Sequence, residues 1–337
     1  MLRRRLLVVT GKGGTGKSTV AAALGVVAAR EGRRTIVAEV AQRTDVPGSL
    51  GAVAGEPFAE TPLREGLWHI SIDPADALRE YLHDQLPSVT LARMLGGSRS
   101  FALLASATPG LAELLSMGKV WELAQEQRRT RGAQPYDLVI LDAPATGHGL
   151  ATLAAPSAFA RAAGTGPVAR QGRLIHDWLT DPRYTGVLAV TRAEALPVAE
   201  TIALAGDLRA QLGLELEAVV VNGLSPQRFG REEEARLRTA LAAREAGDGG
   251  AARESGAARE SGATRESGNP VVFALERALA DLAVARGERR QVKRLRRAVS
   301  LPPLRLPFAV REETGEADLG VLADVLSRTL ARSEAQA

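Results

Sequence analysis

Short, continuously apolar runs recur along the chain and alternate with longer segments of helical periodicity. The first run, Leu6–Thr10, leads into a glycine-rich loop, and residues 18–32 after that loop have the composition of a helix that ends at Gly32. Similar runs follow at residues 34–40, 68–74, 136–144, 185–191, 216–224 and 301–308. Buried parallel strands are apolar throughout, because helices cover both faces of their sheet. The pattern therefore predicts an α/β fold: a doubly wound, mainly parallel sheet with helices on both faces.

Three segments interrupt this alternation within a chain that we expect to form a single domain over residues 1–337. Residues 77–131 and 157–184 are largely helical in pattern and predict helical insertions that cap the sheet. Residues 244–269 repeat Arg-Glu-Ser-Gly three times with small residues between the repeats. Such a composition buries no core, so it predicts a disordered low-complexity loop, with a tether for a partner as the alternative.

The C-terminal part of the chain predicts two more helices. Phe273–Val299 ends in a basic run that could face a membrane or RNA. We favour a solvated face, since no aromatic residues lie between the charges. In residues 318–330 the leucines follow the spacing of a core-facing helix, which favours packing on the sheet over membrane anchoring.

The composition favours a globular protein and excludes metal sites that need cysteine. The chain is 45% hydrophobic and 24% charged, as soluble globular proteins are. It contains no cysteine, so we expect no disulfide, no thiolate zinc site and no cysteine-held iron–sulfur cluster. A net charge of +4 spread along the sequence makes nucleic acid an unlikely partner. No stretch approaches the roughly 18 apolar residues of a transmembrane segment, so we expect a cytoplasmic protein, with a peripheral location at the membrane as the alternative.

The glycine-rich loop fits the phosphate-binding pattern G-x-x-x-x-G-K-[ST]. A strand precedes it and a helix follows it, which is the context that distinguishes this motif from a plain glycine turn. Glycines let backbone N–H groups surround phosphate oxygens, and the N-terminus of the helix adds positive charge. Lys17 is expected to reach the β- and γ-phosphates, Ser18 to ligate Mg²⁺ and Thr19 to contact the α-phosphate. The expected nucleotide-binding residues here are Gly11, Lys12, Gly13, Gly14, Thr15, Gly16, Lys17, Ser18 and Thr19.

Lys12 is an addition to this pattern. Only four of the 43 basic residues are lysines, and two of them lie in this loop. The form G-K-G-G-x-G-K-[ST] resembles the deviant loop of dimeric switch ATPases, which include positioning proteins of the MinD/ParA type and the arsenite-pump and tail-anchor-targeting ATPases. The resemblance implies that Lys12 crosses a dimer interface and stabilises charge on the partner's nucleotide.

The segment Leu141–Pro156 resembles switch II of the ArsA/Get branch of these ATPases, and the chain is identified as a bacterial, actinobacterial-type member of that branch. Asp142, at a strand end, is placed to hold the shell of a Mg²⁺ ion through water. The resemblance implies a Mg²⁺-dependent ATPase that couples ATP hydrolysis to binding and release of a protein or membrane-linked partner. It also implies a homodimer, or a heterodimer with a paralogue.

Two later segments extend the resemblance. Glu194 matches a glutamate that contacts nucleotide across the dimer. Asn222 matches an asparagine that hydrogen-bonds the adenine, and Pro307 and Phe308 match a short loop that packs against the base. An amide suits this role because it pairs with both donor and acceptor edges of adenine.

The chain departs from the family where an aspartate positions the attacking water. Glu39 holds that position here and is the expected water-positioning residue, with Asp45 as a second candidate. The lack of cysteine disfavours arsenite transport and leaves no zinc clamp for a dimer. The alternatives to the switch ATPase are a MinD/ParA-like positioning ATPase and a module that senses ATP without significant hydrolysis.

Overall fold

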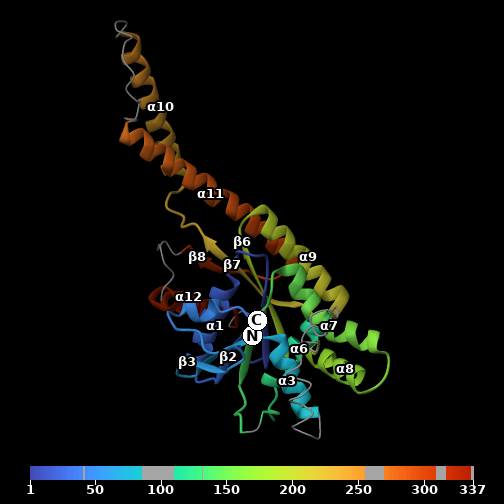
Figure 1. The fold of residues 1–337 in the computed structure, drawn as a ribbon. Coiled ribbons are helices and arrows are strands. Elements are labelled where there is room, and N and C mark those ends of the chain that lie inside the picture. Colours follow the sequence, from blue (N-terminus) through green and yellow to red (C-terminus); the bar gives the residue numbers. More distant parts are fainter. Residues whose placement is uncertain (41, 86–109, 131, 255–268, 309–315, 335–337) are drawn as a thin grey trace, which may run out of the picture.

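The computed structural model describes residues 1–334 apart from positions 41, 86–109, 131, 255–268 and 309–315. Within these residues eight strands form one sheet in the order β3-β4-β2-β5-β1-β6-β7-β8 (Figure 1). All neighbouring pairs are parallel except β3 and β4. The strands are β1 (Leu6–Thr10), β2 (Thr35–Val40), β3 (Thr61–Arg64), β4 (Leu67–Ile72), β5 (Leu138–Asp142), β6 (Thr185–Arg192), β7 (Leu216–Leu224) and β8 (Leu304–Pro307). This confirms the predicted α/β class.

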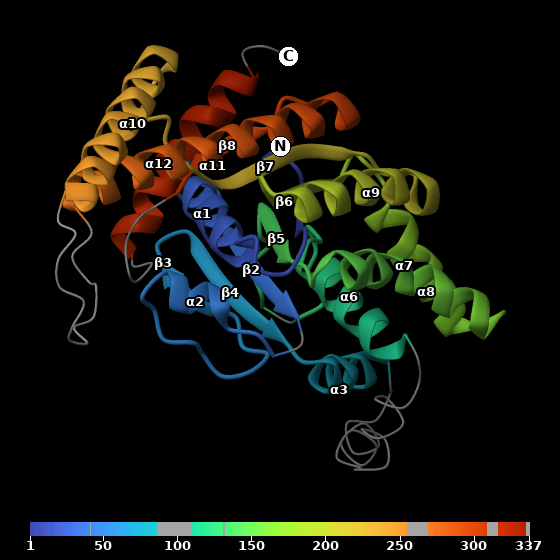
Figure 2. The ribbon, with the colours of Figure 1, turned by 90° about the horizontal axis from the view of Figure 1, so that it is seen from above.

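Helices surround the sheet, as the view from above shows (Figure 2). The described helices are α1 (Lys17–Arg30), α2 (Asp45–Ser49), α3 (Pro74–Gln85), α6 (Leu111–Leu123), α7 (Thr146–Ala163), α8 (Pro167–Leu179), α9 (Ala195–Leu212), α10 (Arg231–Glu254), α11 (Pro270–Val299) and α12 (Glu316–Glu334). In the part of the chain that the structure describes, none of them is both long and apolar enough to cross a membrane.

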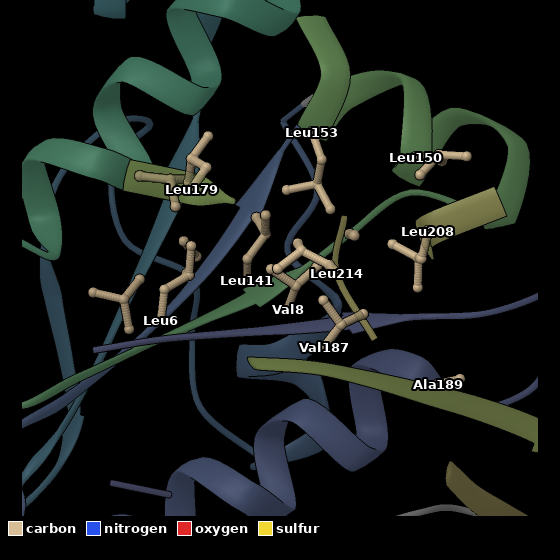
Figure 3. Packing of buried hydrophobic residues seen from close by; sticks show 14 of the residues in the cluster. Leu6, Val8, Leu141, Leu150, Leu153, Leu179, Val187, Ala189, Leu208 and Leu214 are labelled. Carbon is tan, nitrogen blue, oxygen red and sulfur yellow. The ribbon is translucent and has the colours of Figure 1, made fainter. Parts of the chain in front are cut away.

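Alternate residues of β1 belong to two separate cores. Leu6 and Val8 pack with residues of α6, α7, α8 and α9 on one face of the sheet (Figure 3). Leu7 and Val9 pack with α1 and α12 on the opposite face. All four side chains have no exposed surface. Burying a Val or Leu contributes about 1.5–3 kcal/mol, so both faces of the strand stabilise the fold, which explains why the run is apolar at every position.

The strand β3 was not predicted. It pairs antiparallel with β4 at the edge of the sheet and contains Pro62. Its residues are half-buried or exposed, so the sequence carries no apolar run there. An edge strand tolerates proline because one side of it has no ladder to complete.

The helical segments fall as follows in the structure. The range 77–131 contains most of α3 and all of α6, and its residues 86–109 lie outside the described residues. The range 157–184 contains α8 but begins inside α7, which starts at Thr146. Helix α10 is described as far as Glu254, so it covers the first part of the predicted loop 244–269, and positions 255–268 lie outside the described residues.

The helices α10 and α11 form a two-helix arm. Figure 1 shows α10 and the first part of α11 side by side and projecting away from the sheet. Arg286 of α11 forms an ion pair with Glu234 of α10, and Leu282 is buried beside it. Further along α11, Val292 and Leu295 join the core on the α9 side.

The closing helix α12 packs on the other face of the sheet, as predicted. Leu319 and Leu326 are buried with residues of α1, and Leu322 and Leu330 pack against the same core. The helix thereby covers the face of the sheet that α1 leaves open near β8.

Candidate functional site

The topology brings the candidate site residues to one edge of the sheet. In β2, β5 and β1, which are neighbours, Glu39 is in register with Asp142 and Asp142 with Val9. The glycine-rich loop starts directly after β1, and α1 starts at Lys17. Ligands of parallel α/β sheets bind at the carboxyl ends of the strands, so the loop, the two carboxylates and the first turn of α1 meet where such a ligand is expected.

Two glycines allow the loop to lie close to neighbouring strands. Gly11 has a φ of +141°, and a Cβ there would lie 2.0 Å from the carbonyl oxygen of Val190 in β6. Gly16 has a φ of +88°, and a Cβ there would lie 2.3 Å from Nδ2 of Asn222 in β7. The positive φ favours glycine at both positions, and at Gly11 the backbone contact requires it as well. Gly13 and Gly14, by contrast, are exposed.

The loop carries a largely buried cation. The ammonium of Lys17 donates to the carbonyl oxygen of Lys12 over 3.3 Å, and the hydroxyl of Thr15 donates to the same oxygen over 2.8 Å. Burial lowers the pKa of Lys17, although the nearby carboxylate of Asp142 opposes this shift. A buried ammonium in a glycine-rich loop is suited to compensate the charge of a phosphate.

Ser18 and Asp142, the two residues expected to hold Mg²⁺, are in contact. Ser18 Oγ donates to Asp142 Oδ2 over 2.6 Å, and Asp142 is completely buried. Its other oxygen, Oδ1, has no hydrogen-bond partner among the described residues. Burial raises the pKa of the Asp142 carboxyl, against the effects of Ser18 and Arg43.

The oxygens at this point fit a hard cation. One carboxylate oxygen each from Glu39, Asp45 and Asp142 lies within 4.8 Å of the others, and Ser18 adds a hydroxyl. Mg²⁺ prefers oxygen ligands and is commonly held by one or two carboxylates together with water and phosphate. The unpartnered oxygen of Asp142 gives such an ion, or its water shell, a buried acceptor. The residues present therefore fit Mg²⁺.

An arginine that the sequence did not indicate lies among these oxygens. Arg43 Nη2 is 2.7 Å from Ser18 Oγ and 2.9 Å from Asp45 Oδ2, and it also contacts Asp142 Oδ2. Burial disfavours its charge, but the carboxylates of Asp142, Asp45 and Glu39 outweigh burial and raise the pKa of Arg43. In a chain so rich in arginine, only the three-dimensional structure distinguishes this one.

Glu39, the expected water-positioning residue, has both carboxylate oxygens occupied. It is completely buried and accepts hydrogen bonds from the backbone N–H groups of Asp45 and Val46, over 3.1 and 3.0 Å. Its Oε2 also lies 2.9 Å from Nε2 of His69 in β4, a residue that sequence reasoning missed. Glu39 thus connects the start of α2 to β4, while Asp45 stays exposed. The roles in hydrolysis remain predictions.

Lys12 and Glu194 both contact charged groups at or near α9. The ammonium of Lys12 forms an ion pair with Glu200 of α9, so the side chain is directed away from its own loop. Glu194 directly precedes α9 and pairs with Arg192 over 2.8 Å. The action of both residues on a partner's nucleotide remains a prediction.

The predicted adenine-contacting residues lie beside the phosphate-binding loop. Asn222 Nδ2 donates to the carbonyl oxygen of Thr15 over 2.9 Å. Leu224 of β7 pairs with Pro307 of β8, and the N–H of Phe308 donates to the carbonyl of Leu224 over 2.9 Å. The ring of Phe308 is 51% exposed. Residues from three distant parts of the sequence therefore lie near one another, and their contact with the base remains a prediction.

Comparison with known proteins agrees with this geometry. The family model of the anion-transporting ATPases matches residues 4–164, which include the loop and the segment after β5. The chain is 35% identical to the ATPase BagA of Mycobacterium tuberculosis over 228 residues, which are 65% of this chain and 64% of that protein. It is 29% identical to a putative arsenical pump-driving ATPase of Halobacterium salinarum over 67% of this chain and 36% of that protein.

A third relative is the arsenical pump-driving ATPase of Acidiphilium multivorum, 26% identical over 66% of this chain and 40% of that protein. The matches thus span 64% or less of the length of these relatives. The family match, the sheet order and the convergence of Lys17, Ser18 and Asp142 lead to one conclusion. Residues 4–164 match the anion-transporting ATPase family, and the comparisons support an ArsA-type ATPase.

Proposed function

We propose that the protein is a Mg²⁺-dependent ATPase that converts ATP and water to ADP and phosphate. The observation that carries the proposal is the contact of Ser18 Oγ with the buried Asp142, next to the buried ammonium of Lys17. A hydroxyl, a carboxylate and an ammonium at the end of a glycine-rich loop are the groups that phosphoryl transfer requires.

Each group has a separate task in this proposal. The backbone N–H groups of the loop and the ammonium of Lys17 bind the β- and γ-phosphates and compensate their charge. Ser18 would hold Mg²⁺ directly and Asp142 through water, and the ion supplies further compensation of the charge on the phosphates. Asn222, Pro307 and Phe308 bind the base.

The attacking water is positioned by the loop between β2 and α2. Glu39 accepts from the backbone N–H groups of Asp45 and Val46 at the start of α2, so it holds the end of that loop next to the metal ligands. The exposed carboxylate of Asp45 is the second candidate for direct contact with the water. Glu39→Gln and Asp45→Asn variants separate the two roles, because only the residue that orients the water affects turnover without affecting nucleotide binding.

We further propose that the protein works as a nucleotide-switched dimer, formed with itself or a paralogue. The ion pair of Lys12 with Glu200 supports this, because it directs Lys12 away from the nucleotide site of its own chain. In a dimer closed on ATP, Lys12 exchanges Glu200 for the partner's phosphate, and Glu194 contacts the same nucleotide.

The partner that the switch binds and releases is a protein or a membrane-linked molecule. A largely apolar cavity of about 330 Å³ between α3, α6, α7 and α8 supports this part of the proposal. Its apolar lining includes Leu78, Tyr81, Leu111, Leu114, Leu115, Trp121, Phe159 and Ile175. Concave apolar surfaces of this kind bind apolar ligands or side chains.

Phosphate release from the full chain with Mg²⁺ and ATP tests the proposal. We expect turnover that Lys17→Ala abolishes and Lys293→Ala, a change of an exposed lysine on α11, leaves unchanged. ATP binding with no turnover in the unmodified protein would refute the ATPase and favour the ATP-sensing module. ATP-dependent pelleting with DNA, or with liposomes in the absence of any protein client, would favour the positioning ATPase.

A further inference from the structure

The guanidinium of Arg43 lies at the point where the oxygens of the metal site converge. Its Nη2 is 2.7 Å from Ser18 Oγ and 3.7 Å from Glu39 Oε1, and it contacts Asp142 Oδ2. These three partners come from α1, β2 and β5. One side chain from the loop after β2 therefore bridges three of the elements that build the site.

The charges around Arg43 explain why a cation is needed there. Glu39 and Asp142 are completely buried, and with Asp45 they bring three carboxylate oxygens within 4.8 Å of one another. Like charges at this separation repel, and buried carboxylates are costly without a counter-charge. Arg43 supplies the positive charge that a divalent ion would otherwise provide.

One carboxylate oxygen of the site receives no hydrogen bond from the arginine. Asp142 Oδ1 is buried without a hydrogen-bond partner among the described residues, whereas Oδ2 accepts from both Ser18 and Arg43. A planar guanidinium donates in fixed directions and leaves this oxygen unused. The geometry therefore indicates a second ligand for the same carboxylate.

We propose that Arg43 is a displaceable counter-ion of the metal site, which competes with Mg²⁺ for Ser18 Oγ and with the water shell of the ion for Asp142 Oδ2. The inference rests on the proposed function, which supplies the ion. Mg²⁺ binds oxygen ligands at about 2.1 Å in near-octahedral geometry, so a guanidinium cannot keep its place on the same oxygens. Arg43 would leave these oxygens when the ion is bound.

The surroundings of Arg43 provide a position for the expelled side chain. Its Nε and Nη2 both donate to Asp45 Oδ2, over 3.1 and 2.9 Å. The side chain of Asp45 is 61% exposed, while that of Arg43 is 28% exposed. The guanidinium therefore has an anchor at the solvent side of the site and can leave the buried oxygens while still paired.

Binding of Mn²⁺ to the nucleotide-free full chain, followed by electron paramagnetic resonance, tests the competition. We expect Arg43→Gln to lower the dissociation constant for Mn²⁺ about tenfold, because it removes a positive charge that repels the ion. This change is a small part of the repulsion that a unit charge about 4 Å away can exert on a divalent ion. Arg43→Lys keeps the positive charge on a smaller ammonium group. Its dissociation constant for Mn²⁺ should lie between those of the unmodified protein and Arg43→Gln. Arg183→Gln, which removes an exposed arginine paired with Asp181, is the matched control and should not change binding.

Equal or weaker Mn²⁺ binding by Arg43→Gln overturns the proposal. The gain in affinity must also disappear when Asp142→Asn is added, and a gain that persists would place the ion elsewhere and overturn it as well. Circular dichroism checks that Arg43→Gln is folded, and Arg43→Lys decides the question if it is not. Failure of the unmodified protein to bind a fluorescent ATP analogue would refute the proposed function separately, since the Mn²⁺ comparison uses no nucleotide.

Discussion

A buried ion network around Arg128 offers a quantitative test of how the fold is held together. The guanidinium of Arg128, 1% exposed, forms ion pairs with Glu60 over 2.5 Å and with Glu122 over 2.8 Å. Tyr136 donates to Glu60 over 2.7 Å, and Lys119 lies 3.1 Å from Glu122. The network joins α6 to the segment before β3 and the one before β5.

Replacing Arg128 by alanine leaves two largely buried carboxylates without their main counter-charge. Breaking a buried pair by removing one partner typically costs 3–5 kcal/mol. Here Lys119 and Tyr136 remain to stabilise the carboxylates, and Glu60 is partly accessible to water. We therefore expect Arg128→Ala to lower the free energy of unfolding by about 3 kcal/mol, the lower end of that range.

The effect should depend on pH in a direction that the structure fixes. Burial disfavours the charged form of Glu60 and Glu122, but hydrogen bonds and charge from Arg128 outweigh it and hold the pKa of both carboxyls below the usual 4.5. A depressed pKa stabilises the fold above the pKa of the unfolded chain, and the stabilisation is lost as pH falls through the folded pKa. The difference between the two proteins should therefore be largest near pH 7 and shrink below about pH 4.5.

Urea unfolding followed by circular dichroism at pH 7 and pH 4 measures both effects. The control is Arg183→Ala, whose exposed pair with Asp181 should leave the unfolding midpoint unchanged. A loss of less than about 1 kcal/mol in Arg128→Ala at pH 7, or a loss that grows as pH falls, would refute the reasoning.

Three further predictions concern the candidate site. Lys12→Ala should reduce phosphate release at least about tenfold while ATP binding stays intact, because Lys12 acts on the partner's phosphate; an equal loss of binding, measured with a fluorescent ATP analogue, would contradict that role. Gly11→Ala should abolish ATP binding, since its φ is +141° and its Cβ would lie 2.0 Å from a backbone oxygen, whereas Gly14→Ala, with a φ of +77° and nothing within 4 Å, should keep part of it; similar affinities in the two variants would contradict this reasoning. Glu39→Gln should slow turnover and also lower the thermal midpoint of unfolding, because a neutral amide accepts more weakly from the start of α2; slower turnover at an unchanged midpoint would assign Glu39 a direct role with the water.

The sequence predicted the central sheet well for a physical reason. Strands such as β1 and β5 are buried on both faces, so nearly every position must be apolar, and a run of that kind is visible without any knowledge of its neighbours. The loop motif is equally local. Ser18 and Asp142 are 124 positions apart. Both could be assigned to one edge of the sheet, because Ser18 lies at the start of the helix after the loop that follows β1 and Asp142 ends β5.

The sequence could not indicate residues whose role depends on distant neighbours. Thr61–Arg64 becomes a strand only because the edge of β4 is available beside it. In the sequence His69 is a polar residue within a largely apolar run. Its role becomes visible only in the structure, where its ring contacts the buried carboxylate of Glu39. Arg43 is one of many arginines, and only the meeting of β2, β5 and α1 places it among carboxylates.

The two-helix arm affects how the protein scatters X-rays in solution. The 24 residues of α10 correspond to about 36 Å of helix at 1.5 Å per residue. A compact chain of 337 residues has a radius of gyration of about 20 Å. Mass far from the centre contributes to the squared radius of gyration in proportion to the square of its distance, so the arm raises that radius beyond its share of residues. The arm also lengthens the tail of the pair-distance distribution. Two copies related by a two-fold axis carry two such arms, and the scattering curve then reports the directions of the arms as well as the number of copies.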